Sequence, residues 1–188
     1  MTDTGKPASQ PPPVKTSAAP RPHPPFCARE PASAGKRPSL PKASSLVAAG
    51  EPELDGALEL DQAAAGKKTW TWLNFWAGWC KPCKEEMPLL RGWEKALAGK
   101  LRVVFVSVDD DERLSLKFLE EQPKGGVRQS LHFPPNDDRK VAIERLGIGD
   151  LTKLPTHVLF DPSGAIRCVA SGAIEERDFG VVAKLVGG

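Results

Sequence analysis

The segment Phe75-Trp76-Ala77-Gly78-Trp79-Cys80-Lys81-Pro82-Cys83-Lys84 places two cysteines three residues apart at a change of pattern. The bulky apolar run over residues 69–76 is typical of a buried strand. After the first cysteine, apolar residues return at helical spacing as far as residue 97. We therefore expect a buried strand that leads into a helix, with both cysteines on the first helical turn.

This placement gives the two thiols different chemistry. On one helical turn, the sulfurs of Cys80 and Cys83 are close enough to bond. The helix N-terminus stabilises a thiolate, so we expect a lowered pKa at Cys80 and a nucleophilic role for it. Cys83 lies one turn further in and is suited to attack a mixed disulfide and release the substrate. The spacing therefore indicates a redox-active pair.

A Cys-x-x-Cys pair is also half of a zinc site, but zinc normally takes four ligands. The other candidates are scattered along the chain: Cys27, Cys168, His23, His132 and His157. We therefore expect no metal and no cofactor. Cys168 lies in an apolar run and is expected to be a buried structural thiol, and His157 is expected to be a structural strand residue.

The rest of the folded region alternates strand and helix patterns. Strands are expected over residues 69–76, 101–108, 156–161 and 165–171, and helices over 80–97, 109–122, 137–146 and 175–186. An irregular insertion is expected around residues 132–135. Strands that alternate with helices favour a parallel sheet, and the late hairpin adds an antiparallel edge. The sequence thus predicts an α/β fold with a central mixed sheet flanked by helices.

The first 52 residues differ from the remainder in composition. They contain 12 of the 19 prolines and one aromatic residue, Phe26. Such a segment buries too little apolar surface to offset the entropy of ordering. We expect a disordered Pro/Ala/Ser-rich tail over 1–52 and a folded domain over 53–188. The alternative is a spacer that holds the domain off a membrane or a partner.

Charge and hydropathy exclude some classes of protein. The 26 basic and 24 acidic residues give a net charge of +2, which indicates no nucleic-acid partner. The longest strongly apolar run, residues 101–108, is far shorter than the roughly 18 residues of a membrane span. The tail lacks the apolar core of a secretory signal.

The motif around the two cysteines resembles the active-site segment of the thioredoxin superfamily, and more closely its TlpA/ResA branch. That branch often carries Asn where thioredoxin has a buried Asp, and Asn74 occupies this place. Residues 80–88 match its Cys-x-Pro-Cys-Lys-x-Glu-x-Pro pattern. The similarity extends through residues 154–156, 161–164 and 171–173 and covers about 55–188. The resemblance implies a thioredoxin fold.

The resemblance also implies roles for further residues. Leu154-Pro155 matches the family's cis-proline segment, which faces the disulfide and holds the substrate backbone. Trp79, Leu154, Pro155 and Gly172 would form an apolar docking face. Glu86 matches a helix acid near the cysteines that would carry the proton of Cys83, in place of the missing buried Asp. The plain alternatives are a strand-entry proline, a core tryptophan and a solvated helix acid.

The implied function is that of a thiol-disulfide oxidoreductase that reduces protein disulfides. Cys80 would attack the substrate disulfide, Cys83 would resolve the mixed disulfide, and an electron-donor protein would restore the thiols. A monomer is expected. The resemblance implies a periplasmic or membrane-tethered protein, whereas the chain as written, with no visible signal, would be cytoplasmic if complete.

Two other functions use the same residues. A copper-handling or assembly protein would employ the cysteines as soft ligands for Cu(I). A non-catalytic interaction domain would keep the thioredoxin fold without the exchange reaction. The spacing of two residues between the cysteines, together with Pro155, favours the oxidoreductase.

Overall fold

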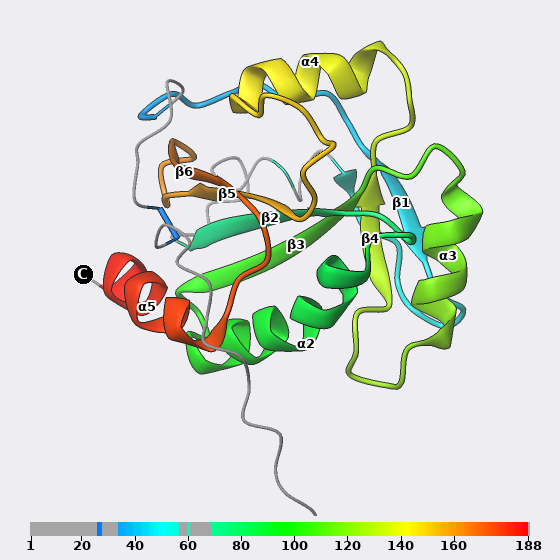
Figure 1. Ribbon diagram of the computed structural model, residues 1–188, viewed down its shortest axis with the longest axis horizontal. Helices are drawn as coiled ribbons and strands as arrows, with labels where there is room; N and C mark the ends of the chain where they lie inside the picture. Colours follow the sequence, from blue (N-terminus) through cyan, green and yellow to red (C-terminus); the bar gives the residue numbers. More distant parts are fainter. Residues whose placement is uncertain (1–25, 28–33, 57–59, 61–68, 188) are drawn as a thin grey trace, which may run out of the picture.

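The computed structural model describes residues 26–27, 34–56, 60 and 69–187. Six strands form one sheet in the order β1-β4-β3-β2-β5-β6 (Figure 1). The strands are β1 (Ser44–Val47), β2 (Trp70–Trp76), β3 (Leu101–Ser107), β4 (Gln129–His132), β5 (Thr156–Phe160) and β6 (Ile166–Ser171). The helices are α2 (Lys81–Ala96), α3 (Glu112–Glu121), α4 (Asp137–Leu146), the 3₁₀ turn η1 (Glu176–Asp178) and α5 (Phe179–Gly187).

The sheet is mixed, as the sequence predicts. Its central strand β2 pairs in parallel with β3 and antiparallel with β5. β5 and β6 form the antiparallel hairpin at one edge. Because β2 lies in the middle of the sheet, its side chains are buried on both faces, which explains its almost uninterrupted run of large apolar residues.

Alternate residues of β2 contribute to two separate cores. Trp72 and Trp76 face a core shared with α2, α3 and α5, whereas Leu73 and Phe75 face a core shared with α4. Figure 1 shows the corresponding layers, with α2 and α5 on one side of the sheet and α4 on the other. Asn74 has the same parity as the two tryptophans, so it points to the face covered by α2.

The predicted boundary at residue 52 is wrong for the second part of the tail. Residues 44–47 form strand β1, which pairs antiparallel with β4 along the sheet edge, and Ala43, Leu46 and Ala48 are buried. The stretch that was expected to be irregular before α4 also includes the end of β4. Both strands have four residues, too few to show a clear period in sequence. Residues 1–25 and 28–33 of the predicted tail lie outside the described residues.

The expectation of a free thiol at Cys168 is also wrong. Cys168 is buried, but it is bonded to Cys27, with a Cα–Cα distance of 5.2 Å and a sequence separation of 141. Beside this disulfide, Phe26 stacks on Trp72 with ring centroids 4.5 Å apart. The pairing of two single cysteines so far apart depends on the tertiary fold, which the local patterns do not contain.

Among the described residues, no helix has the length and apolar character needed to cross a membrane.

Candidate active site

Cys80 and Cys83 lie where the central strand passes into α2. Cys80 is the N-cap residue of the helix, and the backbone N–H of Cys83 donates a hydrogen bond to Cys80 Sγ at 3.3 Å. The two sulfurs form a disulfide, and both residues are buried. Free N–H groups and the helix dipole favour negative charge at this position. After reduction, the same geometry would stabilise a thiolate at Cys80.

The loop before Cys80 is fixed by residues of the β3–α3 connection, of α2 and of α3. The backbone N–H of Gly78 donates to Asp109 Oδ2 at 2.7 Å, and Lys84 Nζ donates to the Gly78 carbonyl at 2.8 Å. A Cβ on Gly78 would lie 2.8 Å from the backbone of Leu114, so no larger residue fits without a shift. These contacts fix the loop that carries Trp79.

Trp79 is 62% exposed, the most exposed of the large apolar side chains among the described residues. It lies outside both cores, so the alternative of a core tryptophan is wrong. An exposed indole one residue before the nucleophile is suited to contact a partner. Its docking role remains a prediction.

The other predicted docking residues meet at the same end of the sheet. Thr156 pairs with Phe75, so Pro155 lies level with the last residue of β2, where the loop to Cys80 begins. The Leu154–Pro155 peptide bond is cis, as the resemblance implies. The Gly172 N–H donates to the Pro155 carbonyl at 2.8 Å, and Gly172 has a φ of 103°, which favours glycine.

Glu86 lies one helical turn after Cys83 and is only 3% exposed, so the alternative of a solvated helix acid is wrong. Residues three apart on a helix have Cβ atoms about 5–6 Å apart. Asn74 Nδ2 donates to Glu86 Oε1 at 2.7 Å, and the Ile174 N–H donates to Oε2 at 2.9 Å. Despite these hydrogen bonds, burial raises the pKa of Glu86 to about 8.

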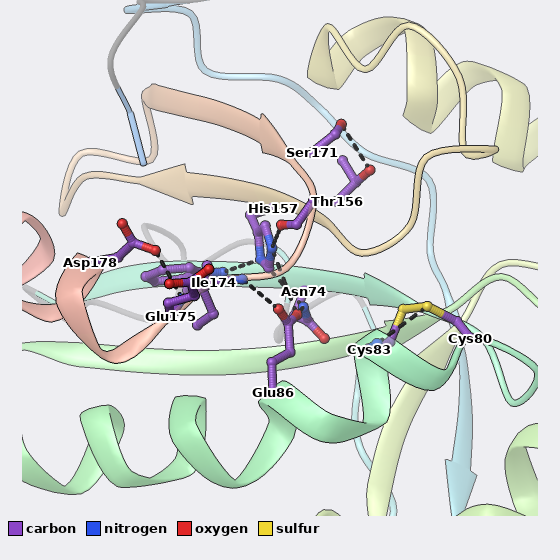
Figure 2. A network of polar contacts seen from close by, with 12 residues as sticks. Asn74, Cys80, Cys83, Glu86, Thr156, His157, Ser171, Ile174, Glu175 and Asp178 are labelled. Carbon is purple, nitrogen blue, oxygen red and sulfur yellow. Dashed lines mark hydrogen bonds and ion pairs between the residues drawn. A yellow bond between two sulfur atoms is a disulfide. The ribbon is translucent and has the colours of Figure 1, made fainter. Parts of the chain in front are cut away.

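His157 is the neighbour of Glu86 that the sequence reasoning missed. It pairs with Asn74 across β2 and β5, and its Nε2 lies 3.7 Å from Glu86 Oε1 (Figure 2). Burial lowers the pKa of His157 to about 4, so the ring is neutral at neutral pH. No local signal in the sequence indicates this contact, because it depends on the register between β2 and β5.

The described residues contain no group of three or more His, Cys, Asp or Glu side chains arranged to hold a metal ion. The polar groups near the cysteines form hydrogen bonds with one another instead. What this arrangement can do chemically is exchange a disulfide and move the accompanying proton.

The chain is similar to proteins of one family along most of its described length. The sequence model of the thioredoxin-like family matches residues 68–166. The thioredoxin-like protein YneN of Bacillus subtilis is 32% identical over 131 residues, which are 66% of this chain and 68% of YneN. The thiol-disulfide oxidoreductase ResA of Oceanobacillus iheyensis is 32% identical over 103 residues, 54% of this chain and 49% of that protein. The chain thus spans about half the length of the ResA relatives.

Solved structures agree on the fold. The thioredoxin domain of a thiol-disulfide oxidoreductase from Bacteroides vulgatus superposes with a TM-score of 0.59 at 21% identity, covering 81% of this chain and 97% of that one. A DsbF homologue from Corynebacterium diphtheriae superposes with a TM-score of 0.58 at 21% identity, covering 79% and 85%. The sheet and helices are those of a thioredoxin-like fold, the Cys80–Cys83 disulfide fits the redox pair of the thiol-disulfide oxidoreductases among its relatives, and the chain belongs to the thioredoxin-like family.

Proposed function

We propose that the protein reduces protein disulfides by exchange through Cys80 and Cys83. The Cys80 thiolate attacks one sulfur of the substrate disulfide, forms a mixed disulfide and releases one substrate thiolate. The Cys83 thiolate then attacks Cys80 Sγ and releases the second substrate thiolate. The substrate gains two electrons and two protons, and the protein is left with the Cys80–Cys83 disulfide. A dithiol protein must supply the electrons for the next cycle.

The observation that carries this proposal is the position of Cys80 as the N-cap of α2, with the Cys83 N–H directed at its sulfur. Among the described residues, this backbone N–H donates to the sulfur at 3.3 Å, so the helix backbone itself supports negative charge on Cys80. A thiolate is the reactive form in exchange.

We propose that Glu86 is the group that exchanges a proton with Cys83. Burial raises its pKa to about 8, so both its acid and its carboxylate forms are accessible close to neutral pH. As a carboxylate it accepts the proton of Cys83 before the resolving attack, and as an acid it returns a proton in the reverse direction. Burial keeps this proton transfer apart from bulk solvent.

We further propose that the substrate lies across the disulfide between Trp79 and the segment formed by Leu154, Pro155 and Gly172. Trp79 offers an exposed apolar surface on one side. On the other side, the hydrogen bond between Gly172 and Pro155 gives this segment a fixed backbone. A substrate chain in this position presents its disulfide to Cys80.

We propose the direction of electron flow, toward the substrate, because little stabilises the reduced form of the pair. A strong oxidant owes its high potential to a stabilised reduced state. Here the two lysines next to the cysteines in sequence have other partners: Lys84 donates to the Gly78 carbonyl, and the exposed Lys81 pairs with Glu85 at 3.6 Å. The helix N-terminus is therefore the main stabilising influence on the Cys80 thiolate, which favours a reductant.

The second disulfide bears on where the protein works. Cys27–Cys168 involves neither cysteine of the redox pair, and Cys27 is next in the chain to the stacked Phe26. Structural disulfides persist in oxidising compartments. We therefore propose that the protein acts outside the reducing cytosol, in line with the compartment that the family resemblance implies.

The test is to trap the mixed disulfide. The reduced Cys83→Ser variant is incubated with a synthetic peptide that contains an intramolecular disulfide, and adducts are identified by mass spectrometry. We expect a one-to-one adduct on Cys80 that dithiothreitol releases, and no adduct for the Cys80→Ser control. No adduct in either variant, or an adduct through Cys83 in the control, would overturn the proposal.

A further inference from the structure

A row of hydrogen-bonded groups connects the segment around Pro155 and Gly172, which we call the docking segment, to the buried Glu86. Gly172 donates through its N–H to the Pro155 carbonyl, and its own carbonyl lies 3.1 Å from His157 Nε2. Two residues later, the Ile174 N–H donates to Glu86. His157 therefore holds the start of the Gly172–Ile174 segment, and the other end of this segment holds the carboxyl group.

The hydrogen bonds of His157 determine its tautomer. The Gly172 carbonyl can only accept, so Nε2 carries the proton. Trp72 Nε1–H donates to Nδ1 at 3.1 Å, so Nδ1 must accept. A second proton on Nδ1 would face the indole N–H and leave two donors opposed. The ring is thus held in its neutral form by geometry.

The charge around Glu86 makes the state of His157 important. From β5, the titratable group that faces Glu86 is His157, whereas Cys83, three residues earlier on the same helix, is held in the disulfide and does not titrate in the oxidised protein. β2 contributes the neutral amide of Asn74, and the Gly172–Ile174 segment contributes a backbone N–H; both donate hydrogen bonds to Glu86. Figure 2 shows Glu86 pointing from α2 toward Asn74 and His157. Of these contacts, an imidazolium at His157 would be the one positive charge able to hold Glu86 ionised.

We propose that His157 is a positioning residue of the exchange reaction, which fixes the Gly172–Ile174 segment against Glu86 and, by remaining neutral, allows that carboxyl group to keep its proton. This inference rests on the proposed role of Glu86 and adds a residue to it. In the folded protein, His157 then fixes the position of both Gly172 in the docking segment and the carboxyl group of Glu86. Loss of the Nε2–H donor frees the Gly172 carbonyl and loosens the Ile174 contact, which admits water to Glu86.

Two amide substitutions of His157 distinguish the hydrogen bond made by Nε2 from the one made by Nδ1. Glutamine in His157→Gln places an amide near the position of Nε2 and can still donate to Gly172. Asparagine in His157→Asn reaches only the position of Nδ1 and can serve Trp72 but not Gly172. The variants have similar polarity, so the comparison isolates the bond to the docking segment.

The measurement is the titration of the Glu86 carboxyl carbon by NMR in the oxidised protein labelled with ¹³C-glutamate, with Glu86→Gln to assign the signal. We expect a midpoint near pH 8 in the wild type, a similar midpoint in His157→Gln, and a fall of about one pH unit or more in His157→Asn. The pH profile of the resolving step should move with it. An unchanged midpoint in His157→Asn would overturn the proposal and leave His157 as a packing residue.

A second variant decides the question if His157→Asn does not fold. Trp72→Phe keeps an aromatic ring but removes one of the two N–H groups that oppose a proton on Nδ1, the other being on the Asn74 amide nitrogen at 3.3 Å. We expect His157 to become easier to protonate and the Glu86 midpoint to fall, and an unchanged midpoint counts against the proposal. These titrations need no substrate, so a wild-type protein that reduces no disulfide would refute the proposed function separately.

Discussion

The buried carboxyl group of Glu86 should make the stability of the oxidised protein depend on pH, and replacing it by glutamine should remove that dependence. Glu86 is packed between α2 and the sheet and accepts hydrogen bonds from Asn74 and Ile174. A glutamine of the same size can accept at one oxygen but carries no titratable proton. The comparison therefore isolates the free energy of ionising the buried acid.

The sign follows from the shift in pKa. Burial raises the pKa of Glu86 from 4.5 to about 8, so the folded state holds the proton more tightly than the unfolded state. This contribution to stability is complete below pH 4.5 and is lost as the pH rises through 8, with a slope of about 1.4 kcal/mol per pH unit. His157 acts in the opposite sense, because burial lowers its pKa from 6.5 to about 4; its contribution grows by only about 0.4 kcal/mol above pH 6.5 and is common to both proteins.

Between pH 6.5 and 8, Glu86 is thus the member of the pair whose ionisation changes the stability. We expect the wild type to lose about 1.5 to 2 kcal/mol relative to Glu86→Gln over this range. The assay is urea denaturation of the oxidised proteins, followed by tryptophan fluorescence at several pH values. Glu85→Gln is the matched control, since the exposed neighbour should leave the wild-type slope intact. Parallel curves for the wild type and Glu86→Gln would refute the reasoning that the folded protein keeps this acid protonated.

Two further predictions concern the supports of the site. Gly78→Ala puts a Cβ 2.8 Å from the backbone of Leu114, so we expect a loss of about 1–3 kcal/mol in urea denaturation and a slower exchange rate; wild-type values would mean that this loop is free to move. Removing the second disulfide by combining Cys27→Ala with Cys168→Ala opens a loop of 141 residues and should lower the free energy of unfolding by about 5 kcal/mol, while the folded variant keeps its exchange rate. An unchanged urea midpoint would show that these two cysteines are not joined.

Features encoded within short segments could be predicted from the sequence. The bulky run before Cys80 and the helical spacing after it placed the two cysteines at the start of a helix, where the structure has them. The hairpin of β5 and β6 also follows from local signals, because a Pro-Ser-Gly turn separates two apolar runs. In each case, the residues that determine the structure are neighbours in the chain.

Features that depend on distant pairing could not be predicted. The neighbourhood of Glu86 exists because Asn74 and His157, 83 residues apart, are opposite each other on adjacent strands. The burial of Glu86 requires that register and the return of the chain at Ile174. The Cys27–Cys168 disulfide similarly needs a segment before the sheet to reach its last strand, which a proline-rich composition does not indicate.

The reduction potential of the Cys80–Cys83 pair tests the proposed function most directly. The oxidised protein would be equilibrated in glutathione or dithiothreitol buffers of known potential, and the thiols formed would be alkylated and counted by mass spectrometry, with Cys27 and Cys168 monitored separately. Because little besides the helix N-terminus stabilises the Cys80 thiolate, we predict a potential below about −240 mV, in the range of thioredoxin-type reductants. A value above about −150 mV, in the range of strong oxidants, would contradict the assignment as a reductase.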